Sequence, residues 1–287
     1  MTFYGDPRGD SHTHSSAHES PKTRFTFMLW EILSVAMEFG FVILLFGLFC
    51  VAVLYSSVGH GGASGYLAVL SMSSYGLMES LWLKQHSWVL NLVVAGIAFF
   101  YYQRSGFHNF KLTIPFIVAS IPMAFIGGYI SIDDFYYDIL LSFVLFWASW
   151  KLLSKNKINP KTDDLTFKKA IPWGGGIGFF SGVIGVGGGI FLSPILLLKG
   201  WATPKTAAAT SALFIWVNSL SGLIGANVSG ELLIDWDIMV YFVSVVLIGG
   251  LLGSMYGVKV ANEKTIKQLL VIVLIIAGLK RLIQIIS

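Results

Sequence analysis

Two glycine clusters are the segments of this sequence whose residue types and spacing could bind a ligand. The first, "VGHGGASG" at Val58–Gly65, follows an apolar run long enough to cross a bilayer, and the second, "IGVGGGIF" at Ile184–Phe191, lies between two short apolar segments. Glycine costs roughly 1 kcal/mol relative to alanine inside a helix, so each cluster predicts an interrupted helix. The N–H groups left free at such a break, at the positive end of the next helix dipole, can bind a small anion.

We expect the two clusters and nearby polar residues to form one site. His60 could donate a hydrogen bond to a bound anion or carry a coupling proton, or it could simply bond to a neighbouring carbonyl group. Amide and hydroxyl side chains within apolar helices could line the site, or serve only in helix packing. The expected substrate-binding residues are Gly59, His60, Gly61, Gly62, Ala63, Ser64, Asn91, Gly185, Val186, Gly187, Gly188, Gly189, Thr210, Ser211 and Asn218.

Other kinds of chemistry find little support in the sequence. An enzyme would need clustered carboxylates, histidines or a nucleophile with its base, and His60 is isolated at membrane depth. We therefore predict no catalytic residue and no cofactor. His12, His14 and His18 lie in a polar tail without a carboxylate or cysteine frame, which favours a disordered tail over a metal site. No basic patch is interleaved with aromatic residues, so nucleic acid is not an expected partner.

The composition is typical of a protein that spans a membrane several times. Of the 287 residues, 55% are hydrophobic and only 12% are charged, about half the charged share of a soluble domain. The apolar runs are continuous rather than alternating, which indicates helices that satisfy their own backbones in lipid. The sequence thus predicts an all-α multi-span protein of the cell inner membrane. The polar residues Lys84 and His86 are expected to precede a helix near the membrane interface.

The chain divides into two halves that resemble each other. Three glycines of the first cluster recur 126 residues later in the second, the glycine of "FIGGY" at Gly127 recurs at Gly253, and Asn91 recurs 127 residues later at Asn218. These ordered matches predict an internal repeat. The predicted organisation is a disordered polar tail over residues 1–25, a first transmembrane repeat over 26–153, a cytoplasmic basic linker over 154–169 and a second transmembrane repeat over 170–287.

Loop charges orient the two repeats in opposite directions. A basic loop of the first half corresponds to an acidic loop of the second, and the following acidic loop corresponds to a basic one. Lys and Arg prefer cytoplasmic loops, so equivalent loops lie on opposite faces and the repeats are inverted. Inverted repeats with broken helices are the layout of many secondary transporters. The loops compared contain Arg104 and Lys111; Glu231, Asp235 and Asp237; Asp133, Asp134 and Asp138; and Lys259, Lys264 and Lys267.

From about Phe39 to the C-terminus the sequence resembles the TauE/SafE sulfite exporter family, also called the TSUP permeases. The segments that carry the resemblance are "GHGGASGYLAVLSM", "IPMAFIGGYI", "GVIGVGGGIFLSPILLL" and "PKTAAATSALFIWVNSLSG". The first half departs from the commonest pattern at His60, Ala63 and Ser64. The resemblance implies passage of small sulfur-containing anions, such as sulfite or organosulfonates, usually outward across the bacterial cytoplasmic membrane. It also implies that the glycine-cluster backbone and nearby polar residues bind the substrate.

We therefore expect a permease with eight or so crossings plus half-helices, working by alternating access around the two glycine-rich breaks. Its expected partners are the anion and the lipid bilayer, while a coupling proton and a second copy of the chain are left open. The alternatives are a channel for small anions or neutral solutes, and an uptake permease for another organic anion.

Overall fold

A computed structural model describes residues 21–130, 146, 150, 153 and 165–286 of the chain. The chain forms two compact units, residues 1–40 and residues 41–287. The described part of the first unit is the beginning of helix α1, and the account below concerns the second unit. Three predicted segments lie outside the described residues in whole or in most of their length: the polar tail, the acidic loop around residues 133–138 and the basic linker.

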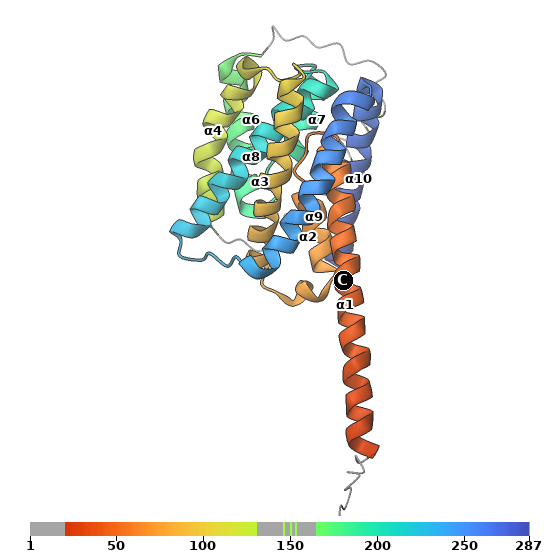
Figure 1. The fold of residues 1–287 in the computed structure, drawn as a ribbon. Helices are drawn as coiled ribbons and strands as arrows, with labels where there is room; N and C mark the ends of the chain where they lie inside the picture. Colours follow the sequence, from red (N-terminus) through yellow and green to blue (C-terminus); the bar gives the residue numbers. More distant parts are fainter. Residues whose placement is uncertain (1–20, 131–145, 147–149, 151–152, 154–164, 287) are drawn as a thin grey trace, which may run out of the picture. The chain divides into compact units, whose positions relative to one another are not determined.

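Every regular element of the described chain is helical, which confirms the predicted all-α class (Figure 1). The helices that follow the two glycine clusters are short, as predicted, with 9 residues in α2 and 11 in α7, whereas the helix before the second cluster, α6, has 18 residues and is longer than predicted. The first half contains α1 (Pro21–Ser56), α2 (Ala63–Ser71), the 3₁₀ turn η1 (Ser74–Leu77), α3 (Ser80–Arg104) and α4 (Phe110–Tyr129). The second half contains α6 (Phe167–Ile184), α7 (Gly189–Lys199), α8 (Pro204–Val228), α9 (Trp236–Met255), the π-helical turn η3 (Tyr256–Val260) and α10 (Glu263–Ile286).

Polar residues in the loops begin three of the long helices. The Asn109 side chain accepts a hydrogen bond from the Lys111 N–H at 3.0 Å at the start of α4. Thr203 does the same for α8, which then begins with Pro204, and Asp235 does so for α9. Such caps satisfy N–H groups that have no acceptor within the helix. They explain why these helices begin two or three residues before the apolar runs of the sequence.

Helix α3 also begins earlier than predicted, and this corrects the placement of Lys84 and His86. Both lie within α3 rather than before it. Gln85 and His86 are fully buried because they hold the loop between α8 and α9. The Gln85 side-chain amide donates to the Glu231 carbonyl oxygen at 2.6 Å, and His86 Nε2 accepts from the Asp235 N–H at 3.1 Å.

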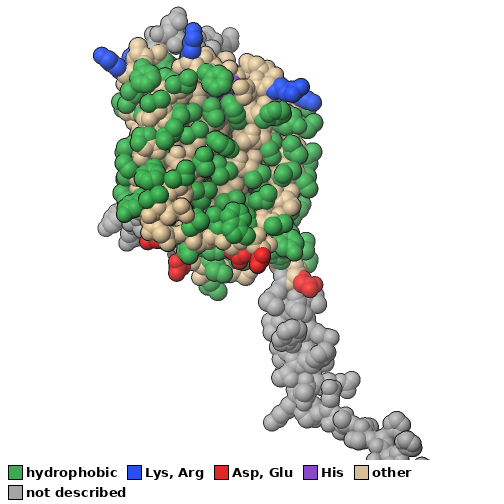
Figure 2. Space-filling model, turned by 60° about the vertical axis from the view of Figure 1, so that its left-hand side comes forward, with side chains coloured by type: hydrophobic (Ala, Val, Ile, Leu, Met, Phe, Trp, Pro, Cys, Tyr) green, Lys and Arg blue, Asp and Glu red, His purple; other side chains and the backbone are tan. Residues whose placement is uncertain are grey.

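Four described helices are long and apolar enough to cross a membrane, judged by length and composition. They are Glu38–Ser56, Phe110–Tyr129, Pro204–Val228 and Trp236–Val260. Figure 2 shows a broad hydrophobic belt with Lys and Arg at one end and Asp and Glu at the other. This distribution is that of a protein whose middle faces lipid and whose ends face water.

The loops that were compared by charge in the sequence lie at these two ends of the molecule. At the basic end, Lys205 Nζ donates to the Val258 carbonyl oxygen at 3.0 Å and lies 4.8 Å from the centre of the Phe107 ring. These contacts join the loop after α3, the start of α8 and η3. At the acidic end, the start of α3 holds the loop that contains Glu231 and Asp235. That the basic end faces the cytoplasm stays a prediction.

Glycines allow the helices to pack backbone against backbone. An added Cβ at Gly127 of α4 would overlap the Phe179 carbonyl oxygen of α6, and one at Gly253 of α9 would overlap the Val53 carbonyl oxygen of α1. Gly127 precedes Gly253 by 126 residues, and Val53 precedes Phe179 by the same number. Equivalent glycines therefore make equivalent contacts, as an internal repeat requires, while the inverted relation of the repeats stays a prediction.

Candidate functional site

The two glycine clusters interrupt helices, as predicted. We call residues 57–62, between α1 and α2, break 1, and residues 185–188, between α6 and α7, break 2. The last glycine of each break precedes the next helix with a positive φ, 102° at Gly62 and 79° at Gly188. Positive φ costs glycine little and other residues much more, so the glycines set the shape of both breaks.

The two breaks lie side by side in the interior. An added Cβ at Gly187 would lie 2.8 Å from Asn91 Nδ2 and 2.8 Å from Ile215 Cγ2. One at Gly61 would overlap Asn91 Oδ1 and lie 3.1 Å from the same Ile215 atom. Both breaks are buried along their whole length. Two segments more than a hundred residues apart thus share the same neighbours, Asn91 from α3 and Ile215 from α8.

Asn91 joins break 1 to the long helices. Its Oδ1 accepts a hydrogen bond from the N–H of Ala63, the first residue of α2, at 2.9 Å. Its Nδ2 donates to Ser219 Oγ on α8 at 3.2 Å. Asn91 therefore caps α2 from a different helix, because the residue that precedes α2 is a glycine and has no side chain to do so.

His60 reaches from break 1 to the first turn of α7. Its Nε2 lies 2.9 Å from the Gly189 carbonyl oxygen and 3.0 Å from Ser193 Oγ. Ser193 Oγ lies 2.7 Å from Ser211 Oγ on α8. With Nε2 protonated, the imidazole donates to the Gly189 carbonyl group. The structure thus shows the bond to a carbonyl group, while a hydrogen bond to an anion and a coupling proton on His60 stay predictions.

Several buried polar groups around the breaks have no hydrogen-bond partner among the described residues: His60 Nδ1, Tyr66 OH, Ser181 Oγ and both amide atoms of Asn218. Tyr66 faces Gly62, and Ser181 faces Gly188. The N–H groups of Gly189 and Ile190, in the first turn of α7, also have no acceptor in the described chain. Buried polar groups are nearly always paired with protein, water or a ligand, so this region has spare capacity to bind a polar ligand.

Comparison with known proteins assigns the family. The chain matches the model of the family described as "Sulfite exporter TauE/SafE" over residues 43–281. The chain belongs to the TauE/SafE family. It is 31% identical over 241 residues to "Probable membrane transporter protein y4hK" of Sinorhizobium fredii, which covers 82% of this chain and 95% of that protein. It is 28% identical over 191 residues to "Probable membrane transporter protein YunE" of Bacillus subtilis, covering 59% of this chain and 69% of that protein. No solved structure matches the chain.

This membership agrees with the structure. Relatives in the TauE/SafE family are named as membrane transporters and not as enzymes, and the chain is a multi-pass membrane transporter. Within the described parts of this TauE/SafE protein, no group of three or more His, Cys, Asp or Glu side chains lies close enough to hold a metal ion.

Most of the residues predicted for the site are brought together. Gly59–Ser64 and Gly185–Gly189 form the two breaks and the helix starts that follow them, and Asn91 lies between the breaks. Ser211 joins this group through Ser193.

Two of the predicted residues have hydrogen-bond partners away from the breaks. Ser64 Oγ bonds to Tyr55 OH at 3.0 Å, and Thr210 Oγ1 bonds to Thr113 Oγ1 of α4 at 3.3 Å. Asn218 has no partner among the described residues. It follows Phe214 by one helical turn, and Phe214 packs against Gly188.

Sequence reasoning missed Ser193, Ser219 and Ile215. Ser193 stands one helical turn after Gly189, the last glycine of its cluster, and that spacing was an available signal. Ser219 and Ile215 belong to an apolar helix, and nothing in their local sequence distinguishes them. Their place at the site follows from the packing of α3, α8 and the two breaks.

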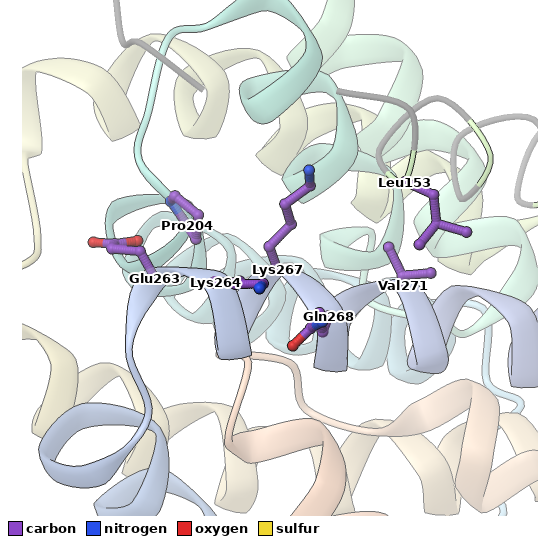
Figure 3. Close-up of a pocket in the computed structure, with 7 residues that line it drawn as sticks. All are labelled: Leu153, Pro204, Glu263, Lys264, Lys267, Gln268 and Val271. Carbon is purple, nitrogen blue, oxygen red and sulfur yellow. The ribbon is translucent and has the colours of Figure 1, made fainter. Parts of the chain in front are cut away.

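A surface pocket at the basic end lies apart from the breaks. It has a volume of about 320 Å³ and contains no predicted site residue. Figure 3 shows Lys264, Lys267 and Gln268 on α10 and Glu263 at its start, next to Pro204 of α8. The Glu263 carboxylate accepts a hydrogen bond from the Lys205 N–H at 3.0 Å, so this pocket carries both signs of charge.

Proposed function

We propose that this TauE/SafE protein is a permease that exports small sulfur-containing anions, sulfite or an organosulfonate, by alternating access around the two breaks. One observation carries the proposal: Gly61 and Gly187, from breaks in different halves of the chain, share the neighbours Asn91 and Ile215. The printed name of the family supports the substrate class. The proposed substrate-binding residues are those of the two breaks, with Asn91, Ser193 and Ser211 beside them.

The chemistry of the site suits an anion that must bind and leave again. The open N–H groups of Gly189 and Ile190 lie at the N-terminus of α7, where the helix dipole favours a negative ligand by about 0.3–1 kcal/mol. Hydroxyl and imidazole groups lie within hydrogen-bond distance of this helix end. The stem of the Lys84 side chain packs against Gly185, so a cationic residue borders break 2. Binding mainly by the neutral donors at the start of α7 would hold the anion weakly enough to be released.

The contacts between the two halves support the proposal of alternating access. The hydrogen bonds of His60 run from break 1 to α7 and thus connect the two predicted repeats. If one repeat rocks against the other, these bonds are among those that must open. Protonation of His60 would alter these contacts and the site, because the second proton leaves the ring no acceptor nitrogen and places a positive charge beside the bound anion. We therefore keep His60 as the proposed carrier of a coupling proton.

The decisive experiment is a ligand screen with the purified full-length protein. Thermal unfolding is measured with sulfite, sulfate, thiosulfate, sulfoacetate and taurine, since a ligand that binds only the folded state raises the melting temperature. Ligands that do so are then tested for counterflow in proteoliposomes. Saturable counterflow supports a carrier, whereas flux without counterflow supports the alternative of a channel. No shift and no flux with any of the five compounds would contradict the proposal.

A matched pair of variants ties the activity to the breaks. Gly187→Ala forces a side chain into a residue with φ of 78° and against Asn91 and Ile215, at a cost of about 1–2 kcal/mol for the left-handed backbone alone. Gly176→Ala adds the same methyl group on the exposed side of α6, where nothing lies within 4 Å. We expect counterflow to fall about tenfold or more in the first variant and to persist in the second. Equal counterflow by the two variants would mean that transport does not depend on the shape of break 2.

A further inference from the structure

A second pocket at the basic end lies between the loop that joins α3 to α4 and the loop that joins α7 to α8. Its volume is about 480 Å³, within the range of small-molecule sites. The residues that matter for its chemistry are Phe107, His108, Lys111, Trp201, Thr203 and Thr206. No acidic residue is among the described residues that line it.

The charged side chain among the described residues that line this pocket is a cation, Lys111. Lys111 is exposed at its edge, and the Lys205 ammonium lies over the ring of Phe107, which lines it. A concave surface that carries one sign of charge raises the local concentration of ions of the opposite sign. The pocket of Figure 3 differs in this respect, because the Glu263 carboxylate forms part of its lining.

His108 lines the pocket, and two neighbouring aromatic rings hold its side chain in place. The His108 ring is held edge to face by Phe99, at 5.0 Å between ring centres, and by Phe110, at 4.4 Å. Its Nε2 lies 2.9 Å from Thr113 Oγ1, and its Nδ1 is buried without a partner among the described residues. Burial lowers the pKa of His108, so the ring is mostly neutral at pH 7 and retains both a donor and an acceptor nitrogen.

Polar side chains connect His108 with the region of the breaks. Thr113 is fully buried, and its hydroxyl group bonds to that of Thr210 at 3.3 Å. The next residue of α8, Ser211, bonds to Ser193, which bonds to His60. The step from Thr210 to Ser211 runs along the backbone without a hydrogen bond between the side chains. Hydroxyl groups thus form a series, interrupted between Thr210 and Ser211, from His108 at the pocket to His60 in break 1.

We propose that this pocket is a second anion-binding site, an entry vestibule in which a small sulfur oxyanion binds before it passes Thr113 and Thr210 to reach the breaks. The inference rests on the proposed function, because it takes the breaks as the destination. On this proposal, the contact between the Thr113 and Thr210 hydroxyl groups has to open for the anion to pass.

Site-directed labelling tests whether the pocket binds an anion. Cys50 is the single cysteine of the chain, so Cys50→Ala gives a background without thiols. In that background, Thr206→Cys places a thiol in the pocket, and Thr265→Cys places a half-buried control on α10 outside its lining. Labelling rates with a fluorescent maleimide are compared with and without saturating sulfate or sulfoacetate. Sulfite and thiosulfate are avoided because both are nucleophiles that consume the reagent.

Of sulfate and sulfoacetate, we expect the one that raises the melting temperature more to slow labelling of Thr206→Cys about fivefold or more and to leave Thr265→Cys unchanged. If such an anion stabilises the protein but leaves both labelling rates unchanged, it binds elsewhere and the vestibule is refuted. If neither anion stabilises the protein or alters labelling, the vestibule is refuted for this class of ligand.

Transport kinetics give a second test. Lys111→Met removes the exposed cation from the pocket, and Lys264→Met removes one from the other pocket at the same end. In low-salt counterflow, we expect Lys111→Met to raise KM about tenfold with little change in maximal rate, because steering by charge changes encounter rates by ~10-fold or more. Lys264→Met should leave KM near that of the unmodified protein. Equal KM values in both variants, with transport intact, would overturn the vestibule and leave the proposed function standing, whereas absent transport in the unmodified protein would count against the proposed function.

Discussion

The two breaks are built alike and capped differently. In each, the glycine that precedes the next helix has a positive φ, and the equivalent pair, Gly62 and Gly188, are 126 residues apart. At break 1, the N–H of Ala63, the first residue of α2, donates to Asn91. At break 2, the N–H of Gly189, the first residue of α7, has no acceptor in the described chain.

The two breaks also differ in the contacts that their side chains make. Break 1 carries a side chain, His60, that bonds to α7, whereas break 2 carries Val186 at the equivalent position. Break 1 is thus held by side chains of other helices and in turn holds its neighbour. Both breaks keep open hydrogen-bond donors, because the N–H groups of Gly61, Gly62 and Ser64 also have no acceptor among the described residues. On the proposed function, N–H groups of both breaks bind the anion, and His60 of break 1 also positions α7.

The largest expected effect concerns His60, which only break 1 has. His60→Gln keeps a side chain that can donate to the Gly189 carbonyl group but cannot titrate near neutral pH. If His60 carries a coupling proton, counterflow by the variant loses its dependence on pH between about pH 5 and 8. The measurement is counterflow in proteoliposomes across that range. A pH profile that matches the unmodified protein would reject proton coupling through His60.

The next effect compares the two asparagines. Asn91→Ala leaves the Ala63 N–H without an acceptor, and such buried unpaired groups cost about 1–3 kcal/mol. Asn218→Ala breaks no hydrogen bond with any described residue, so the free energy of unfolding should fall less. Ligand-free thermal unfolding measures both variants. A greater loss of stability in Asn218→Ala would mean that the two positions have been assigned the wrong roles.

The smallest effect concerns the link between each break and the helix before it. The Tyr55 hydroxyl bonds to Ser64 Oγ at 3.0 Å in the first half. Ser181 and Ile190 occupy the equivalent positions in the second half and form no such bond. Tyr55→Phe should lower stability by about 1 kcal/mol, the typical net value of a hydrogen bond, and Ser181→Ala should change it little. The same unfolding measurement checks both, and equal effects would remove this distinction between the halves.

The sequence predicted the breaks because their cause is local. Glycine weakens a helix wherever it occurs, so the glycine clusters were sufficient to predict an interruption between α1 and α2 and another between α6 and α7. The start of α3 was predicted seven residues too late, because Lys84, Gln85 and His86 interrupt the apolar pattern. Gln85 and His86 are buried there by bonds to a loop about 150 residues away, which no local pattern reports.

Most residues of the site were predicted, but the residue of the second half that is equivalent to Asn91 was predicted wrongly. The repeat matched Asn91 with Asn218, whereas α3 and α8 each have 25 residues and begin at Ser80 and Pro204. Counted from those starts, the residue that corresponds to Asn91 is Ile215. The structure agrees, since both Gly61 and Gly187 contact Asn91 and Ile215. Ser193 escaped prediction because its partner His60 lies 133 residues away.

The glycine-lined contact between α4 and α6 limits how this protein can move. Added Cβ atoms at Gly174, Gly178 and Gly182 of α6 would overlap the backbone of α4, and one at Gly128 of α4 would overlap that of α8. Ordinary helix pairs can slide a little as the side chains between them change rotamer. Here no side chain lies between the backbones at these points, so α4, α6 and α8 are expected to travel as one block. The hinges of any transport cycle then have to be sought in the loops and breaks around that block.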